Sequence, residues 1–102
     1  MDFSKLMEQA QMMQNQMGKL EEQLNNTIYE GNNGGKNGVT IKINGTYAVE
    51  EVEIGEDLLE KDNKEMLQDM IMIAMNAAVT KASDDRERKL GSVTQGLKIP
   101  GM

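Results

Sequence analysis

The sequence contains no histidine and no cysteine. These absences exclude imidazole acid–base catalysis, thiolate nucleophiles, disulfides and the usual zinc ligands. The acidic residues Glu50, Glu51 and Glu53 lie on the edge of a predicted strand, and the sequence indicates neither an apolar pocket nor a nucleophile beside them. We therefore expect no enzyme, no metal or other cofactor, and no small-molecule substrate.

Aromatic residues and long apolar runs are also scarce. One phenylalanine, two tyrosines and no tryptophan are too few for the stacking platforms that bind single-stranded nucleic acid. The most apolar stretch, residues 66–79, contains Gln68, Asp69 and Asn76 and is shorter than the roughly 20 residues that cross a bilayer. No charged segment followed by an apolar one begins the chain. We expect a soluble cytoplasmic protein with no membrane partner.

The net charge of −6 is unevenly distributed along the 102 residues. Residues 27–60 carry two lysines against seven acidic residues, a balance of 2 − 7 = −5. Residues 80–102 carry five cations against three acidic residues, a balance of 5 − 3 = +2. The overall sign argues against a nucleic-acid partner, whereas the basic C-terminal segment is compatible with one.

Apolar residues recur with a heptad spacing through the first 24 residues. This 3–4 spacing predicts a helix, ending at about Asn25, with one narrow apolar seam that requires another helix as partner. Polar residues occupy its other faces, and Gly18 lies among them. The seam consists of Phe3, Leu6, Ala10, Met13, Met17, Leu20 and Leu24.

Three strands are predicted in the middle of the chain, at residues 27–30, 39–43 and 46–54. The glycine- and asparagine-rich residues 31–38 between the first two predict a mobile connection, since they lack a phosphate-binding spacing. Asn44-Gly45 favours a hairpin with a type I′ turn. The alternation in the third strand is irregular, because Val49 and Val52 are three residues apart. Either a β-bulge corrects the phase or Val49 lies on the second face of the sheet.

A second helix is predicted from near Asp62, where Asp62 and Glu65 have capping-box spacing, after a short turn at residues 57–59. Its apolar residues, between Met66 and Ala82, form an arc too wide for one three-stranded sheet to cover. We therefore expect a second subunit to cover part of it. Gly91 is predicted to end the helix and to begin a loose tail.

These elements predict one α+β domain of order α-β-β-β-α, in which two long helices flank a three-stranded antiparallel sheet. The expected parts are a helical arm at 1–26, the sheet at 27–55, a C-terminal helix at 56–90 and a flexible tail at 91–102.

Several of these segments resemble the YbaB/EbfC family of bacterial nucleoid-associated proteins. The resemblance spans nearly the whole chain and depends on the order of the segments, since no single one is diagnostic. Gly18 and Ser92-Val93-Thr94 depart from the common family pattern. The matching segments are Gln9–Gln14 with Met17, Leu20 and Glu21; Gly34-Gly35; Gly38-Val39; Ile43–Gly45 with Val49, Val52, Glu53 and Ile54; Asp57–Leu59 with Asp62, Lys64–Leu67 and Asp69; Asn76–Ala78; and Leu97–Pro100.

The resemblance implies a tweezers-like homodimer whose protruding helices bind double-stranded DNA with little or limited sequence preference, and no catalytic activity. It further implies a place in the nucleoid and a role in chromosome organisation or gene expression.

Four cations within nine residues are the strongest candidates for contacting DNA phosphates: Lys81, Arg86, Arg88 and Lys89. Lys5 and Lys19, on the first helix, are weaker candidates, as is Lys98 in the tail. The alternative interpretation is that these cations form i,i+4 pairs on a solvated helix, Asp84 with Arg88 and Asp85 with Lys89.

The dimer contacts are expected on both helices, at Met66, Met70 and Ile73 and at Met13, Met17 and Leu20. Ten methionines also permit a different function. Because methionine forms adaptable apolar surfaces, the chain could be a homodimeric interaction module whose Met-rich helices dock a protein partner.

Overall fold

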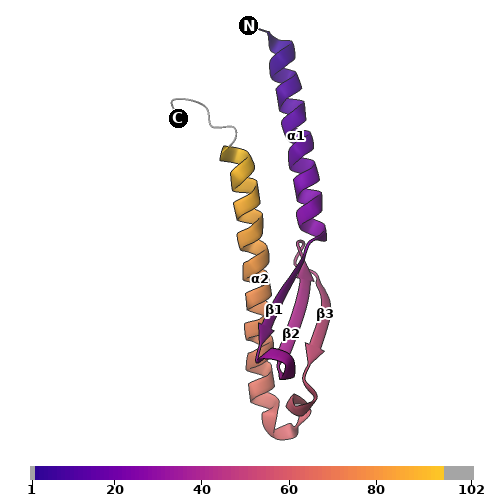
Figure 1. The fold of residues 1–102 in the computed structure, drawn as a ribbon, viewed down its shortest axis with the longest axis vertical. Helices are drawn as coiled ribbons and strands as arrows, with labels where there is room; N and C mark the ends of the chain where they lie inside the picture. The colour runs from indigo at the N-terminus through magenta and orange to yellow at the C-terminus, as the bar shows by residue number, and fades with distance from the viewer. Residues whose placement is uncertain (1, 96–102) are drawn as a thin grey trace.

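The computed structural model describes residues 2–95, and their side chains as far as residue 92. It contains helix α1 (Phe3–Asn26), strands β1 (Ile28–Asn33), β2 (Val39–Asn44) and β3 (Val49–Ile54), and helix α2 (Lys64–Gln95). This order confirms the predicted α-β-β-β-α fold. The molecule is elongated, 72 × 26 × 17 Å, because both helices extend beyond the same end of the sheet (Figure 1).

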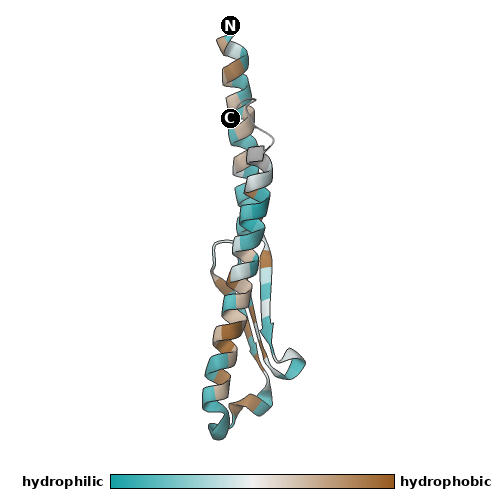
Figure 2. Cartoon of the chain, turned by 90° about the vertical axis from the view of Figure 1, so that its left-hand side faces the viewer, coloured by the Kyte–Doolittle hydropathy of each residue, from teal (hydrophilic) through white to brown (hydrophobic). Residues whose placement is uncertain are grey.

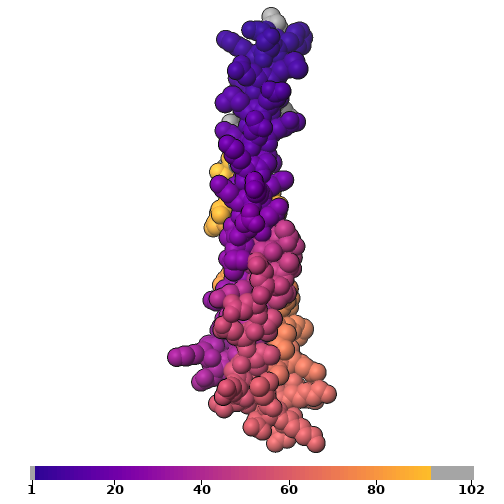
Figure 3. Space-filling model, turned by 90° about the vertical axis from the view of Figure 1, so that its right-hand side faces the viewer, coloured from indigo at the N-terminus to yellow at the C-terminus, as the bar shows by residue number. Residues whose placement is uncertain are grey.

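Helix α1 stands almost free of the sheet. It begins where Asp2 Oδ1 accepts a hydrogen bond from the Ser4 amide at 3.1 Å, and it ends at Asn26, one residue beyond the predicted end. Leu24 is its only buried residue. The space-filling view shows α1 continuing the long axis past the sheet (Figure 3). The predicted apolar seam is therefore largely uncovered within one chain, with Phe3 70% exposed and Leu6 47% exposed.

The sheet is antiparallel in the order β1-β2-β3, so that β2 is central. Strand β1 continues to Asn33, three residues beyond its predicted end. Near the end of this strand, Asn32 Oδ1 accepts a hydrogen bond from the Gly35 amide at 3.0 Å, and the Asn32 amide group donates to Thr40 Oγ1 at 2.7 Å. These bonds hold a 3₁₀ turn at Gly35–Asn37. The connection predicted over residues 31–38 is therefore shorter and more regular than expected, because its first three residues belong to β1 and the Asn32 side chain satisfies the backbone of the turn.

The β2–β3 hairpin forms where Asn44-Gly45 predicted it, but the type I′ turn was wrong. The positive φ lies at Tyr47, +68°, and the Tyr47 amide donates to the Asn44 carbonyl at 2.9 Å. Asn44 Oδ1 also accepts from the Thr46 amide at 2.8 Å, which favours this wider turn. Strand β3 consequently starts at Val49, three residues later than predicted.

A β-bulge explains the irregular alternation of β3. The register changes between Lys42, which pairs with Glu51, and Ile43, which pairs with Val49. Glu50 is therefore the extra residue, and Val52 pairs with Ile41 on the same face. Of the two alternatives considered from the sequence, the bulge is confirmed.

Two short 3₁₀ turns, Glu56–Leu59 and Lys61–Asn63, connect β3 to α2. Asp62 lies inside the second turn, so α2 starts at Lys64, two residues later than the predicted start. The predicted end at Gly91 was wrong, since α2 continues to Gln95. Glycine lowers helix propensity by about 1 kcal/mol relative to alanine, which weakens a long helix without ending it. Of the flexible tail predicted at 91–102, residues 96–102 lie outside the described residues.

The core forms where α2 crosses β1 and β2. Ala74, Ala78 and Ala82 lie on its inner face and are buried against the sheet. Small side chains let the backbones approach closely: a Cβ added at Gly31 would lie 1.9 Å from the Ala74 carbonyl oxygen. Figure 2 shows the apolar lower half of α2 along the sheet and the hydrophilic segment above it. The sheet residues of the core are Tyr29, Val39, Ile41 and Ile43.

Helix α2 leaves the β3 side of the same sheet face uncovered. Val49 and Val52, which share this face with the buried residues of β2, are each 49% exposed. On α2 itself, Met66 and Ile73 are exposed by 47% and 48%. The apolar arc of α2 is thus only partly covered by its own sheet, as its width predicted.

We predict that Gly31→Ala destabilises the protein by about 2 kcal/mol or more, because the new methyl group would overlap the α2 backbone. Urea unfolding at a fixed protein concentration measures the change. Gly18→Ala is the matched control, since a Cβ at Gly18 meets nothing within 4 Å and alanine favours the helix. Equal unfolding midpoints for Gly31→Ala and the unsubstituted protein would contradict the close contact.

Candidate nucleic-acid interface

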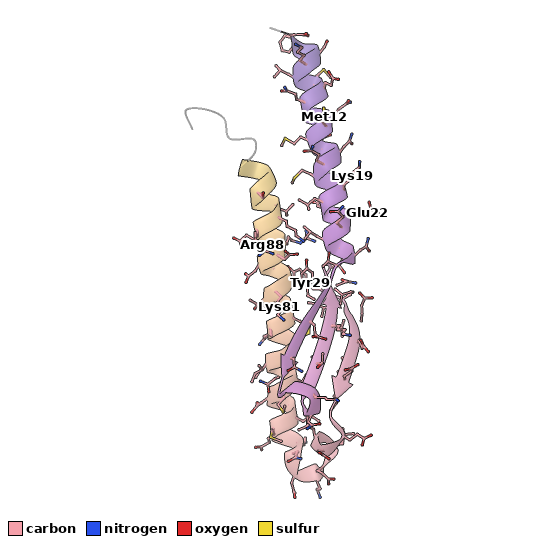
Figure 4. All side chains as sticks on the ribbon, viewed as in Figure 1. Met12, Lys19, Glu22, Tyr29, Lys81 and Arg88 are labelled. Atoms are coloured by element: carbon pink, nitrogen blue, oxygen red, sulfur yellow. The ribbon has the colours of Figure 1, made fainter. Side chains whose placement is uncertain are left out.

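The basic residues of α2 lie on the part of the helix that passes the end of the sheet. Lys81 is beside β1 at the edge of the sheet, and Arg88 is two turns further along (Figure 4). The Arg88 side chain is 76% exposed and that of Lys89 is 45% exposed. These cations are therefore accessible to a large anionic partner from solvent.

Asp85 binds both of these cations. Its Oδ1 accepts a hydrogen bond from Arg88 Nη2 at 2.7 Å, and Lys89 Nζ lies 3.1 Å from its Oδ2. The Tyr29 hydroxyl, from β1, donates to the same Oδ2 at 2.6 Å. With its side chain only 12% exposed, Asp85 connects the exposed cations to the core. We call Asp85, Tyr29, Arg88 and Lys89 the Asp85 cluster.

The contacts of the Asp85 cluster stabilise the ionised carboxylate. Hydrogen bonding from Tyr29, and then from Lys89 and Arg88, lowers the pKa of Asp85 from 3.8 to about 2. Burial and the hydrogen bond to Asp85 raise the pKa of Tyr29 above its ordinary value. Asp85 therefore carries a full negative charge at neutral pH, while Tyr29 stays protonated as its donor.

The i,i+4 pairs considered from the sequence are found in part. Asp85 pairs with Lys89 as expected. Arg88, however, pairs with Asp85 three residues before it rather than with Asp84. Asp84 instead lines an open depression of about 410 Å³ together with Tyr29, Lys81, Asp85 and Arg88.

Arg86 has a different environment from the other cations. Its Nη2 donates to Asn25 Oδ1 at 2.7 Å and to the Gly45 carbonyl at 3.2 Å. These contacts connect α2 to the end of α1 and to the β2–β3 hairpin. A Cβ at Gly45 would lie 1.7 Å from the Leu24 carbonyl oxygen, so the three elements meet closely at this point. Arg86 is thus held at the base of the two projecting helices, half-buried.

The remaining predicted cations are spread over the molecule. Lys81 Nζ donates to the Glu30 carbonyl at 2.7 Å, and the residue stays exposed. Lys5 and Lys19 occupy exposed positions on α1 (Figure 4 labels Lys19). The structure therefore brings Lys81, Arg88 and Lys89 to one part of α2 and places the two α1 lysines on the neighbouring helix. Lys98 lies outside the described residues.

The residues predicted for the dimer interface form two separate groups. Met66, Met70 and Ile73 belong to the start of α2, at one end of the molecule (Figure 1). Met13, Met17 and Leu20 belong to α1, at the other end. One copy of the chain does not bring these groups together.

Three features of the structure were not found from the sequence, two of them hydrogen bonds of this region. The Tyr29–Asp85 bond joins residues 56 positions apart, and the Arg86–Asn25 bond joins residues 61 apart. No local pattern in the sequence marks such contacts. The exposure of Val49 beside Val52 depends on where α2 crosses the sheet, which the sequence alone does not determine.

Within residues 2–95, no helix is long and apolar enough to cross a membrane. In the same part of the chain, acidic side chains do not gather in groups of three or more that could hold a metal ion.

We predict that Arg86→Gln lowers the free energy of unfolding by about 1–3 kcal/mol, because two acceptors at the base of the helices lose a charged donor. Arg88→Gln is the control, because it removes the same single positive charge from the same helix. Its exposed ion pair should change stability by less than about 1 kcal/mol. Urea unfolding of both variants is the measurement, and equal losses would contradict the structural role of Arg86.

A second prediction concerns acid stability. The pKa of Asp85 is lowered on folding, so its stabilising contribution is complete above its ordinary value of 3.8 and disappears as the pH falls toward about 2. The difference in unfolding free energy between the unsubstituted protein and Asp85→Asn should be constant from pH 7 to about 5 and shrink toward pH 2. Other carboxylates titrate in both proteins and largely cancel. A difference independent of pH would contradict the assignment.

Comparison with known proteins relates this arrangement to a family. The sequence profile described as the YbaB/EbfC DNA-binding family matches residues 1–97. A nucleoid-associated protein of Pelotomaculum thermopropionicum is 41% identical over 101 residues, which are 99% of this chain and 95% of the relative. A nucleoid-associated protein of Chloroflexus aurantiacus is 41% identical over 98 residues, which are 96% of this chain and 97% of the relative.

A solved structure supports the same relationship. The crystal structure of an uncharacterized protein from Helicobacter pylori superimposes with a TM-score of 0.76 at 28% identity. The match covers 92% of this chain and 98% of that one. The family match extends over nearly the whole sequence and includes both helices and all three strands. The chain belongs to the YbaB/EbfC DNA-binding family, which is a family of nucleoid-associated proteins rather than of enzymes.

Proposed function

We propose that this protein binds double-stranded DNA as a homodimer, with little or limited sequence preference, through the cations on the projecting part of α2. The observation that carries the proposal is the exposure of Arg88 and Lys89 there, in a chain that is otherwise acidic. Lys81 extends the same surface toward the sheet.

The chemistry of these side chains suits phosphate. A guanidinium has five N–H donors and an ammonium has three, and each uses one contact on Asp85. Most donors of Arg88 and Lys89 therefore remain for phosphate oxygens. Lys5 and Lys19 on α1 are secondary candidates, because α1 projects from the same end of the sheet. Arg86 serves the proposed site indirectly, by fixing where the two helices emerge.

Limited sequence preference follows from the kind of contact. Phosphate contacts fix the position of a protein on the duplex but carry no direct sequence information. Reading the base sequence requires several side chains that reach into a groove in a fixed register. Arg88 and Lys89 are only two side chains on one helical turn, and both contact Asp85, so they do not form such a set. We expect affinity to depend on salt much more than on base sequence.

A second copy of the chain is the proposed occupant of the uncovered apolar surfaces. Three surfaces are available: the α1 seam, the outer residues of α2 such as Ile73, and the β3 side of the sheet with Val49 and Val52. Exposed apolar area of this extent is typical of surfaces that associate. A two-fold dimer would also double the number of cations and allow two stretches of backbone to be bound. The expected contacts at Met66, Met70, Met13, Met17 and Leu20 belong to this proposal.

The proposed location is the nucleoid, within the cytoplasm. It is supported by the names of the relatives from Pelotomaculum thermopropionicum and Chloroflexus aurantiacus, which are nucleoid-associated proteins. Weak sequence preference fits a role in chromosome organisation or gene expression, in which many sites are occupied at once.

The test is a gel-shift titration on unrelated duplexes of equal length at several salt concentrations. We expect binding to all of them, with an affinity that falls steeply as salt rises. The variant Arg88→Gln/Lys89→Gln should bind more weakly, and its slope of log K against log salt should become shallower by about 0.9 for each phosphate that is no longer neutralised. Light scattering on the same samples should give twice 11.4 kDa for both proteins.

The matched control is Lys61→Gln/Lys64→Gln, which removes the same charge from the turn before α2 and from the first residue of α2, far along the helix from Arg88 and Lys89. Its affinity should stay close to that of the unsubstituted protein. Equal weakening in both double variants would contradict the assigned site. No shift at low salt would contradict DNA binding and favour the interaction module, for which exposed Met7 and Met12 on α1 would be the docking surface. A mass of 11.4 kDa at micromolar concentration would contradict the dimer.

A further inference from the structure

Asp85 is the one acidic residue in contact with both Arg88 and Lys89 among the residues whose side chains are described. Asp85 also contacts the sheet, because the buried Tyr29 of β1 donates a hydrogen bond of 2.6 Å to its Oδ2. The cations, by contrast, are on long stems, and their side chains are more exposed than that of Asp85, 76% for Arg88 and 45% for Lys89 against 12%. The carboxylate is thus fixed in place, whereas its partners can turn away from it.

This arrangement places the fixed carboxylate of Asp85 in contact with the two cations that the proposed function assigns to DNA binding. A phosphate that approaches Arg88 and Lys89 must share them with Asp85, and the two anions repel each other at short range. Asp85 cannot withdraw, since Tyr29 holds it against the sheet. The cations can change partner at little cost, because ion pairs made by solvent-exposed side chains are weak.

We propose that Asp85 is a built-in counter-ion that competes with DNA phosphates for Arg88 and Lys89, and thereby limits the affinity of this surface for DNA. The proposal rests on the proposed function and adds a residue that opposes it. Its effect is to keep DNA binding weak enough to be reversible at each contact. The same contacts keep the two side chains beside Asp85 when no DNA is bound.

The competing interpretation is that Asp85 only positions the cations for phosphate. Positioning by Asp85 would help phosphate binding if the cations had few hydrogen-bond donors, or if they were buried and had to be held in one orientation. Arg88 is 76% exposed and gives Asp85 a single hydrogen bond. The two interpretations predict opposite signs: removing the charge of Asp85 strengthens DNA binding if it competes and weakens DNA binding if it positions.

The experiment is the DNA affinity of Asp85→Asn at fixed salt, measured by fluorescence anisotropy on a labelled duplex. Asparagine has the same shape and keeps an oxygen that accepts the Tyr29 hydroxyl. We expect binding to be about 5-fold tighter than for the unsubstituted protein. The matched control is Glu87→Gln, an exposed position on the same turn and the same loss of one negative charge, with an expected gain of less than about 2-fold.

A double-mutant cycle locates the effect. In the Arg88→Gln/Lys89→Gln background the gain from Asp85→Asn should fall below about 2-fold, since the cations for which Asp85 competes are absent. Circular dichroism checks that each variant keeps its helices. Asp85→Ser replaces Asp85→Asn if that variant unfolds, and it carries the same expected gain.

The outcomes separate the two proposals. If the unsubstituted protein binds DNA and Asp85→Asn binds equally or more weakly, the competition is overturned and the proposed function stands. A gain equal to that of Glu87→Gln, or one that survives in the Arg88→Gln/Lys89→Gln background, also overturns it, because the effect is then one of overall charge. If the unsubstituted protein and Asp85→Asn both fail to bind at low salt, both proposals fail.

Discussion

The close approach of α2 to β1 is the contact on which the rest of the molecule depends. Gly31 has no side chain, and Ala74 and Ala78 have only methyl groups, so that the helix backbone lies directly on the strand. Larger residues would move α2 outward and would separate every pair of residues that joins the two elements. The bond from Tyr29 to Asp85 and the bond from Lys81 to the Glu30 carbonyl both join β1 to α2. The position of the basic surface is therefore fixed by the packing of small residues earlier in the same helix.

The same contact explains why the chain has so much uncovered apolar surface. Because α2 lies over β1 and β2, it cannot also cover β3, and Val49 and Val52 stay half-exposed on an otherwise buried face. Helix α1 buries only Leu24, in its last turn, while Arg86 connects that turn to α2 and to the hairpin. One chain of 102 residues thus builds a small core around a junction and leaves two long helix surfaces for other contacts.

Local patterns in the sequence were sufficient to predict the helices and strands, but not the turns and contacts that connect them. The heptad predicted α1 to within one residue of its end, and the alternation at Val39–Ile43 located β2. Errors arose where a side chain satisfies backbone groups, as Asn32 does in the Gly35–Asn37 turn and Asn44 does in the hairpin. The sequence also could not separate Arg86 from Arg88, since both are arginines on one charged helix segment. Their difference depends on Asn25 and Gly45, which are distant in sequence and meet α2 only after folding.

A net charge of −6 and a DNA-binding family are compatible when charge is considered by surface rather than by chain. Three of the acidic residues of the middle segment, Glu50, Glu51 and Glu53, lie on β3, and one of them pairs with Lys42 across the sheet at 3.1 Å. Arg88 and Lys89 lie on the part of α2 that passes the end of that sheet, so ions in solution screen them from much of this acidity (Figure 4). The acidic residue that matters for them is instead the nearest one, Asp85, which touches both Arg88 and Lys89. Short-range pairing within the basic segment, rather than the overall sign of the chain, is therefore the electrostatic property that sets how strongly this surface can attract phosphate.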